Sequence, residues 1–342
     1  MNEISRIGVD TSKSSFALHG VDAAGAVGVR KNLRRGQVLA FFRKLPATVV
    51  VMEACGGAHH WGRKLTALGH EVQLIPPQYV KPYVKRGKND AVDAAAICEA
   101  GGRPGIHFVP IKSEQQQADA MVLKLRDSFV GQRTQLSNAL RGHAAEFGVV
   151  AGKGASQVAK LRAAIEAAEM PELAKEMLAE IGAQIDHLDA RVAELDARLA
   201  AMHKANPVSR LLAGVPGVAR VIALNFALTV DAAAFDSGRH LAAWLGLTPK
   251  QHSTGGKTRL GGISRAGNER LRALLVNGAT SVIEAVLRHG SKLATPWLLK
   301  LLARRPKKVA AVALANKMAR VLWAMMTTGE AYRHPGAAAA VS

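Results

Sequence analysis

The chain has 342 residues, with 46 Lys or Arg against 26 Asp or Glu, so its formal net charge is +20. An excess this large attracts polyanions, of which nucleic acid is the commonest. The aromatic content of only 4% argues against a protein that recognises single strands mainly by base stacking. The N-terminus lacks a signal-peptide pattern and two cysteines make no disulfide framework, so we expect the cytoplasm.

The first part of the chain alternates predicted strands and helices, which predicts an α/β domain over residues 1–112. The apolar run 48–54 predicts a central strand that is buried on both faces and ends at Glu53. Strands are also predicted over residues 6–10, 15–21, 25–33, 71–75 and 107–111, and helices over 36–45, 59–69 and the segment that carries Asp90 and Asp93.

The middle, residues 113–205, predicts two helices joined by the glycine-rich segment 149–156 and folded back as an antiparallel hairpin. In the second helix, apolar residues recur three and four apart with charged residues between them, which is typical of a coiled-coil seam. These residues are Leu178, Ile181, Ile185, Leu188, Val192, Leu195 and Leu199. A structural arm and a dimerisation device both fit this pattern.

The last part, residues 206–333, predicts helices separated by glycine-rich loops, and residues 334–342 predict a disordered tail. The apolar stretch 309–326 contains Asn316, Lys317 and Arg320. Because these polar residues interrupt it, the stretch predicts a core helix, and no membrane is expected as a partner.

Four carboxylates lie at positions where side chains can bind ligands or metals. Asp10 and Glu53 end predicted strands, where α/β sheets hold ligands, and Asp90 and Asp93 are three residues apart on one helix face. If that helix packs across the sheet, the four anions converge and need cations between them. Mg²⁺ or Mn²⁺ would suit these oxygen ligands, and two such ions could support phosphoryl transfer. The order of these elements is the layout of RNase H-like nucleases.

A basic run, Lys85, Arg86 and Lys88, directly precedes the two helix acids and is predicted to contact nucleic-acid phosphates. The competing interpretation is purely structural. In it Asp90 caps its helix, and Asp93 pairs with Lys88 or Arg86.

The segment 248–267 is a glycine-rich basic loop between helices. Its glycines allow backbone amides to approach a phosphate, and Lys257, Arg259 and Arg265 can neutralise it. The hydroxyl of Ser253 could attack a phosphodiester if a base or metal activates it. The alternative is a plain phosphate-binding loop, in which Ser253 only hydrogen-bonds a backbone oxygen.

Two further segments are predicted to contact a nucleic-acid backbone. The turn 213–220 has the form of a helix-hairpin-helix, with Gly214 and Gly217 permitting a tight turn, although a simple helix connection fits as well. The run near residue 306 supplies four cations, Arg304, Arg305, Lys307 and Lys308.

Taken together, these segments carry a family resemblance. The motifs IGVDTSK, VVMEACGG, KNDAVDA, AGVPGVA, LGLTPKQHSTGGKTRLGGISRAG and LRALL occur in this order over nearly the whole chain. In combination they resemble the DEDD transposases of the insertion sequence 110/1111 family, which includes Piv-type DNA invertases.

The resemblance implies an RNase H-like (RuvC-like) α/β domain over 1–112, a coiled-coil connector over 113–205, and a mostly helical C-terminal transposase domain over 206–333. It implies a metal-binding tetrad and a serine nucleophile that becomes linked to DNA as a phosphoserine. The tetrad is Asp10, Glu53, Asp90 and Asp93.

The nucleophile has three candidates. Some relatives place the serine directly before a glycine, where this chain has Thr254. We favour Ser253, because its primary hydroxyl is less hindered, and Ser264 comes third.

The resemblance also implies partners: donor and target DNA, a structured non-coding bridge RNA that pairs with both, and further copies of the chain. We expect a homodimer or homotetramer through the coiled coil, acting at the nucleoid in a prokaryotic cytoplasm. The leading hypothesis is a site-specific DNA recombinase or transposase. The alternatives are a RuvC-like endonuclease that uses metal-activated water, and a nucleic-acid-binding scaffold whose acids are structural.

Overall fold

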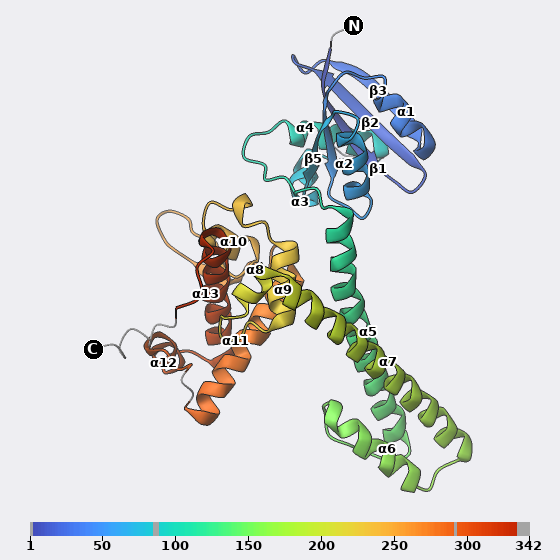
Figure 1. The fold of residues 1–342 in the computed structure, drawn as a ribbon, viewed down its shortest axis with the longest axis vertical. Coiled ribbons are helices and arrows are strands. Elements are labelled where there is room, and N and C mark those ends of the chain that lie inside the picture. The colour runs from blue at the N-terminus through green and yellow to red at the C-terminus, as the bar shows by residue number, and fades with distance from the viewer. Residues whose placement is uncertain (1–2, 85–88, 291–292, 334–342) are drawn as a thin grey trace. The chain divides into compact units, whose positions relative to one another are not determined.

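The computed structural model describes residues 3–84, 89–290 and 293–333. The chain divides into two compact units, Met1–Gln117 and Ala118–Ser342 (Figure 1). The basic run Lys85, Arg86 and Lys88 and the predicted tail lie outside the described residues.

The N-terminal unit contains a mixed five-stranded sheet with the strand order β3-β2-β1-β4-β5. The strands are β1 (Ile4–Thr11), β2 (Ser15–Asp22), β3 (Val27–Arg34), β4 (Val49–Glu53) and β5 (Glu71–Ile75). β1, β2 and β3 are antiparallel neighbours, whereas β4 and β5 run parallel to β1. This mixed sheet, with its helices, has the predicted RNase H-like arrangement.

The strand predicted over residues 107–111 does not form. Val109 makes a single bridge to Leu74, and its N–H donates to the Leu74 carbonyl at 2.7 Å. The next residue is Pro110, which has no N–H to continue a ladder. The prediction was therefore wrong for this segment.

Helices cover both faces of the sheet. They are η1 (Arg35–Gln37), α1 (Val38–Phe42), α2 (Ala58–Thr66), α3 (Pro77–Val80), η2 (Lys81–Tyr83) and α4 (Asp90–Gly101). Val50 and Met52 pack with α1 and α2, whereas Val51 between them packs with α4. All three are fully buried, which confirms the prediction of a central strand that is covered on both faces.

A helical arm follows, made of α5 (Glu114–Glu146), α6 (Val158–Ala167) and α7 (Glu172–Ala205), with η3 (Ala155–Gln157) before α6. It belongs to the C-terminal unit except for the start of α5, which the N-terminal unit includes up to Gln117. Two ion pairs join α5 to α7: Arg126 to Asp196 at 2.7 Å and Arg133 to Asp189 at 2.6 Å. Since later residues of α5 pair with earlier residues of α7, the two helices are antiparallel, as predicted.

The apolar seam of α7 is buried inside a single chain. Leu178 and Ile185 pack in one cluster with Leu140 of α5 and Leu161 of α6, and Leu199 packs with residues of α5 and α9. Of the seven predicted seam residues, six are buried and Ile181 is half-buried. The seam pattern therefore finds packing partners without a second copy.

The remaining helices form one apolar core. They are α8 (Pro207–Leu212), α9 (Arg220–Thr229), η4 (Ala232–Ala234), α10 (Gly238–Trp244), α11 (Glu269–His289), α12 (Pro296–Leu302) and α13 (Lys307–Thr328). α13 is long and apolar enough to cross a membrane by composition, but buried residues such as Ala315, Met318 and Leu322 belong to this core. This packing supports the prediction of a core helix.

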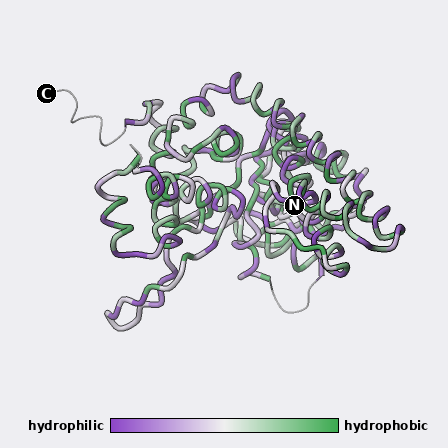
Figure 2. Tube along the Cα trace, turned by 90° about the horizontal axis from the view of Figure 1, so that it is seen from below, coloured by the Kyte–Doolittle hydropathy of each residue, from purple (hydrophilic) through white to green (hydrophobic). Residues whose placement is uncertain are grey.

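A hairpin of β6 (Pro249–Gln251) and β7 (Leu260–Ile263) lies between α10 and α11 and projects away from the helices (Figure 2). The sequence predicted only a loop here. Its glycines hide the two-residue alternation by which strands are normally found, so the two short strands were missed.

Candidate functional site

Asp10 and Glu53 lie at the carboxyl ends of adjacent parallel strands. Val9 of β1 pairs with Met52 of β4, so the two acids follow at the next position of each strand. Val51, two residues before Glu53, packs with α4. Because strand side chains alternate, Glu53 and Asp10 share the sheet face that α4 covers.

α4 runs in the opposite direction to β1. A Cβ at Gly102, after the helix, would meet the guanidinium carbon of Arg6 at 2.5 Å. A Cβ at Gly8 would overlap the Ala94 carbonyl oxygen and would lie 2.7 Å from the Cα of Cys98. Continuing this direction brings the first turn of α4 toward the strand end that carries Asp10.

Asp10 and Glu53 therefore lie next to each other at two strand ends, and the course of α4 directs its first turn, with Asp90 and Asp93, toward the same end of β1. We call this set the acid corner: Asp10, Glu53, Asp90 and Asp93. Their carboxylate oxygens are the hard donors that Mg²⁺ and Mn²⁺ prefer, so the donor chemistry fits such an ion. In the described part of the chain, however, no three His, Cys, Asp or Glu side chains are gathered closely enough to hold a metal.

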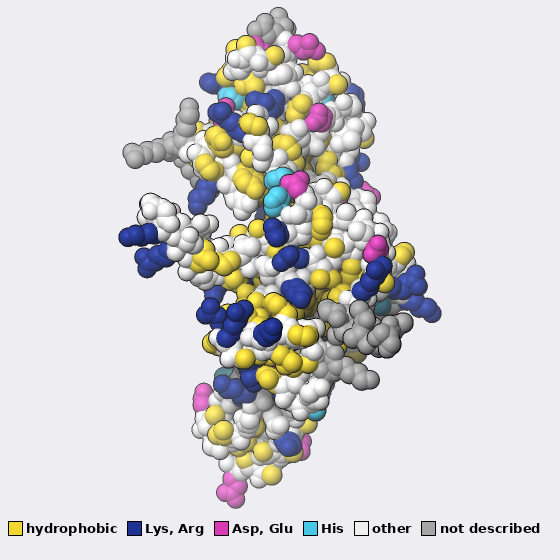
Figure 3. All heavy atoms as spheres, turned by 90° about the vertical axis from the view of Figure 1, so that its left-hand side faces the viewer, with side chains coloured by type: hydrophobic (Ala, Val, Ile, Leu, Met, Phe, Trp, Pro, Cys, Tyr) yellow, Lys and Arg dark blue, Asp and Glu magenta, His cyan; other side chains and the backbone are white. Residues whose placement is uncertain are grey.

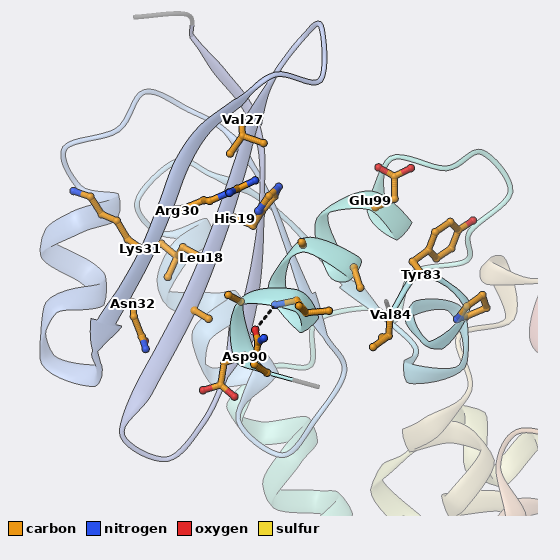
Figure 4. Close-up of a pocket in the computed structure, with 17 residues that line it drawn as sticks. Leu18, His19, Val27, Arg30, Lys31, Asn32, Tyr83, Val84, Asp90 and Glu99 are labelled. Carbon is orange, nitrogen blue, oxygen red and sulfur yellow. Dashed lines mark hydrogen bonds between the residues drawn. The ribbon is translucent and has the colours of Figure 1, made fainter. Parts of the chain in front are cut away.

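The first turn of α4 is capped by Asn89 and not by Asp90. The Asn89 Oδ1 accepts a hydrogen bond from the Val92 N–H at 2.9 Å (Figure 4). This corrects the structural alternative, in which Asp90 was the cap. Asp90 is exposed and Asp93 is half-buried, and both carboxylates lie at the positive end of the helix dipole.

A cavity of about 1110 Å³ opens beside Asp90, between α4 and the strands β2 and β3. Figure 4 shows His19, Arg30 and Asn32 on its strand side. Burial, and then the charge of Arg30, lower the pKa of His19 below its usual value, so its imidazole is neutral at pH 7. His19 was not identified from the sequence. Only the register that pairs it with Gly8 puts it on this face.

The predicted nucleophile region folds as a tight hairpin. The Lys257 N–H donates to the Thr254 carbonyl at 3.0 Å, and Gly255 and Gly256 between them have φ values of 54° and 76°. Two successive positive φ angles define a type I′ turn, which glycine adopts without strain. The hairpin therefore places Ser253 one residue before the turn.

The hydroxyl oxygen of Ser253 is held by two donors. It accepts hydrogen bonds from the Gln251 Nε2 at 3.0 Å and from the Arg259 N–H at 3.2 Å. The structural alternative had Ser253 donating to a backbone oxygen, whereas here it accepts from a backbone amide. Donors aimed at a hydroxyl oxygen favour its deprotonated form. Thr254 instead contributes its carbonyl to the turn.

The cations of this unit that were predicted to contact nucleic acid are all exposed. They are Lys257 and Arg259 on the hairpin, Arg265 at its base, and Arg304, Arg305, Lys307 and Lys308 at the α12–α13 junction.

The two glycines of the α8–α9 turn differ in their surroundings. Gly214 is exposed and its N–H donates to Leu211, while a Cβ at Gly217 would meet the Gly278 carbonyl oxygen of α11 at 2.7 Å. The close packing against α11 therefore requires glycine at position 217, which the sequence did not indicate.

Comparisons with known proteins cover both units. Residues 7–148 match the profile of the IS110-type DEDD transposase domain, and residues 209–294 match the profile described as Transposase IS116/IS110/IS902 family. A putative transposase y4pF/y4sB of Sinorhizobium fredii is 50% identical over 335 residues, which cover 97% of this chain and 87% of that protein.

Two further relatives are similar over most of their lengths. The probable family 20 transposase of Pseudomonas aeruginosa is 46% identical, covering 97% of this chain and 99% of that protein. The transposase for insertion sequence element IS1111A of Coxiella burnetii is 40% identical, covering 97% of this chain and 92% of that protein.

Proposed function

The chain belongs to the IS116/IS110/IS902 family of transposases, enzymes that transfer DNA strands, and we propose that it cuts and rejoins DNA through the hydroxyl of Ser253. The observation that carries this proposal is the pair of donors on the Ser253 oxygen, from Gln251 and the Arg259 amide. These donors orient the oxygen on an exposed, tightly turned hairpin that a DNA strand can reach.

In the proposed reaction, the Ser253 oxygen forms a bond to a DNA phosphorus while the bond from phosphorus to the leaving sugar oxygen breaks. The serine proton passes to a base or to that leaving oxygen. Because one phosphate ester replaces another, the energy of the bond is retained, and a second DNA end can reverse the step.

The DEDD domain implies the use of a divalent metal. The acid corner would hold Mg²⁺ or Mn²⁺, which when bound would offset the negative charge that develops on the phosphate under attack. The carboxylates themselves would hold the ion, because without it their negative charge would repel a DNA phosphate. The acids and Ser253 belong to different units, and the proposed reaction uses both.

The proposal includes two kinds of partner besides DNA. A non-coding bridge RNA would choose the sites by base pairing, and the net charge of +20 supports binding of this second polyanion. A homodimer or homotetramer would form through the helical arm in a bacterial cytoplasm. Exposed Met121, Leu125, Leu173 and Met177 on α5 and α7 support such a contact.

A suicide DNA substrate that traps the covalent intermediate tests the proposal. We expect a protein–DNA adduct with the unaltered chain and with Thr254→Ala, and none with Ser253→Ala. Clean hydrolysis without an adduct would instead favour a RuvC-like endonuclease. Full recombination by an Asp90→Asn, Asp93→Asn double variant would mean that these acids are structural.

A further inference from the structure

A groove of about 1270 Å³ lies in the C-terminal unit, between α13, the start of α10, Trp297 of α12 and the base of the β6–β7 hairpin. Cationic side chains from separate parts of the chain line it. They are Arg239, Arg265, Lys308, Lys317 and Arg320. The sequence had predicted a nucleic-acid contact for only two of these five, Arg265 and Lys308.

The charge of this groove is not compensated. None of its described lining residues is Asp or Glu, and none of the five cations forms an ion pair within the part of the chain that the structure describes. Cations nearby do pair: Lys307 lies 3.7 Å from Glu284, and Arg270 contacts Asp127. Figure 3 shows Lys and Arg side chains gathered at the level of these helices. The groove therefore attracts an anionic ligand.

α13 provides one long wall of the groove. Lys308, Asn316 and Arg320 all line the groove, so they lie on the side of α13 that faces it. The stretch from Lys308 to Arg320 is about 18 Å long at 1.5 Å per residue, which matches about five base-pair steps of 3.4 Å along the axis of a duplex. Lys317 lies 4.5 Å from the ring centre of Trp297, which is 38% exposed, and this contact orients its ammonium group.

The groove continues to the base of the hairpin that carries Ser253, where Gly261 and Gly262 line it. A Cβ at Gly262 would meet nothing within 4 Å, and neither glycine has a positive φ, so the fold itself does not require glycine there. The close approach of a nucleic-acid backbone would require glycine at these positions. Arg265, just beyond, has a φ of 57° and is the one non-glycine residue with a positive φ among the described residues.

We propose that this groove binds the phosphate backbone of one strand of the DNA substrate and leads it to the Ser253 hairpin. The occupant is a polyanion because the groove offers cations without carboxylates. It is DNA because the groove ends at the hairpin whose serine attacks DNA. This inference rests on the proposed function, in that it takes Ser253 as the nucleophile.

The test measures binding of a labelled DNA duplex over a range of salt concentrations, in the full chain with Ser253→Ala so that chemistry is blocked. Adding Lys317→Gln and Arg320→Gln should make the slope of log affinity against log salt shallower by about 2, at about 0.9 per lost phosphate contact. The matched control, Arg288→Gln with Arg333→Gln, removes the same charge from residues that pair with Glu284 and Glu330 outside the groove, and should leave the slope unchanged.

A second variant blocks the groove without altering its charge. Gly262→Val places a side chain in open space, so the thermal unfolding midpoint should stay the same while DNA affinity falls about 10-fold, which corresponds to about 1.4 kcal/mol. Equal slope changes in the groove and control variants would overturn the proposal. So would a loss of affinity confined to an RNA duplex of the same sequence.

The outcomes separate this inference from the proposed function. If the unaltered chain forms the covalent adduct while the groove variants bind DNA normally, the groove assignment fails and the function stands. If no adduct forms but the groove variants lose DNA affinity, the groove binds DNA and Ser253 is not the nucleophile.

Discussion

At the scale of single residues, the Ser253 oxygen depends on Gln251 for one of its two hydrogen bonds. Gln251→Ala removes that donor and leaves the Arg259 amide in place. A neutral hydrogen bond contributes about 1 kcal/mol, so we expect adduct formation to slow by about 5-fold. Single-turnover trapping on a suicide substrate, at saturating DNA, measures this rate.

The control for Gln251→Ala is Arg259→Ala, which deletes a side chain but retains the N–H that contacts Ser253. Its effect should be on salt-dependent DNA affinity and not on the saturated rate. Equal rates for Gln251→Ala and the unaltered chain would show that the Gln251 contact does not position the nucleophile.

The acids of α4 give a second prediction at this scale. Asp93→Asn keeps the size of the side chain but removes a charge from the acid corner, so we expect at least about 100-fold slower strand cleavage if metal binding is lost. Glu99→Gln on the same helix is the matched control, because Glu99 is exposed and pairs with Arg103.

A second readout for Asp93→Asn is independent of activity. An ion that binds only the folded chain raises its thermal unfolding midpoint. Mg²⁺ should therefore stabilise the unaltered chain and Glu99→Gln, and should have little effect on Asp93→Asn. Equal stabilisation of all three would place the metal elsewhere.

These site residues were predictable from the sequence to different degrees. Asp10 and Glu53 follow from strand ends, and Asp90 and Asp93 from their spacing, because each depends on local pattern. His19 and Gln251 could not be predicted in this way. His19 is placed by the cross-strand register, and the contact of Gln251 with Ser253 is formed by the hairpin turn. Arg320 belongs to the same class, because only tertiary packing brings α13 beside the hairpin.

At the scale of elements, the close contact of α4 with β1 determines where the helix acids lie. A Cβ at Gly8 would overlap backbone atoms of Ala94 and Cys98, so Gly8→Ala must displace α4. We expect a loss of about 1–3 kcal/mol in unfolding free energy, as for other overpacked sites, together with a loss of cleavage activity. Denaturant unfolding and the cleavage assay measure the two effects.

Gly56→Ala is the control for Gly8→Ala, because nothing lies within 4 Å of a Cβ at Gly56, close to Glu53 in the chain. It should retain both stability and activity. If Gly8→Ala were as stable and active as Gly56→Ala, the close approach of α4 to β1 would not be required for the site.

Element prediction succeeded where hydrophobic patterns were strong and failed where turn geometry decides. The buried strand β4 was found because its apolar run is continuous and of strand length, and the seam of α7 because its apolar residues recur three and four apart. The segment 107–111 reads as a strand by composition, but Pro110 stops the ladder. The hairpin around Gly255 and Gly256 has strands of three and four residues, too short for a periodic signal.

At the scale of the whole molecule, the seam pattern raised the question of where its partner lies. A heptad pattern requires a packing surface but does not say whether the same chain supplies it. Here α5, α6 and α9 supply it, so the sequence identified the seam and could not identify its partner. A contact between copies would therefore use other faces of the arm.

The final prediction distinguishes the buried seam of α7 from the exposed apolar residues of the arm. Leu188 is 3% exposed within the arm, so Leu188→Ala should lower the unfolding free energy by about 2–5 kcal/mol and leave the number of subunits unchanged. Leu173 and Met177 are 67% and 51% exposed on α7. Because charges there cost little in the isolated chain but oppose an apolar contact, Leu173→Glu with Met177→Glu should dissociate the proposed oligomer at unchanged helicity.

Light scattering across a range of protein concentrations, together with circular dichroism, reads out both variants. The opposite pattern, in which Leu188→Ala dissociates the oligomer and the glutamate pair does not, would mean that the seam opens to receive a second copy. In that case the packing of α7 against α5 and α6 would be exchanged for packing between chains. The proposal of assembly through exposed residues of the arm would then be withdrawn.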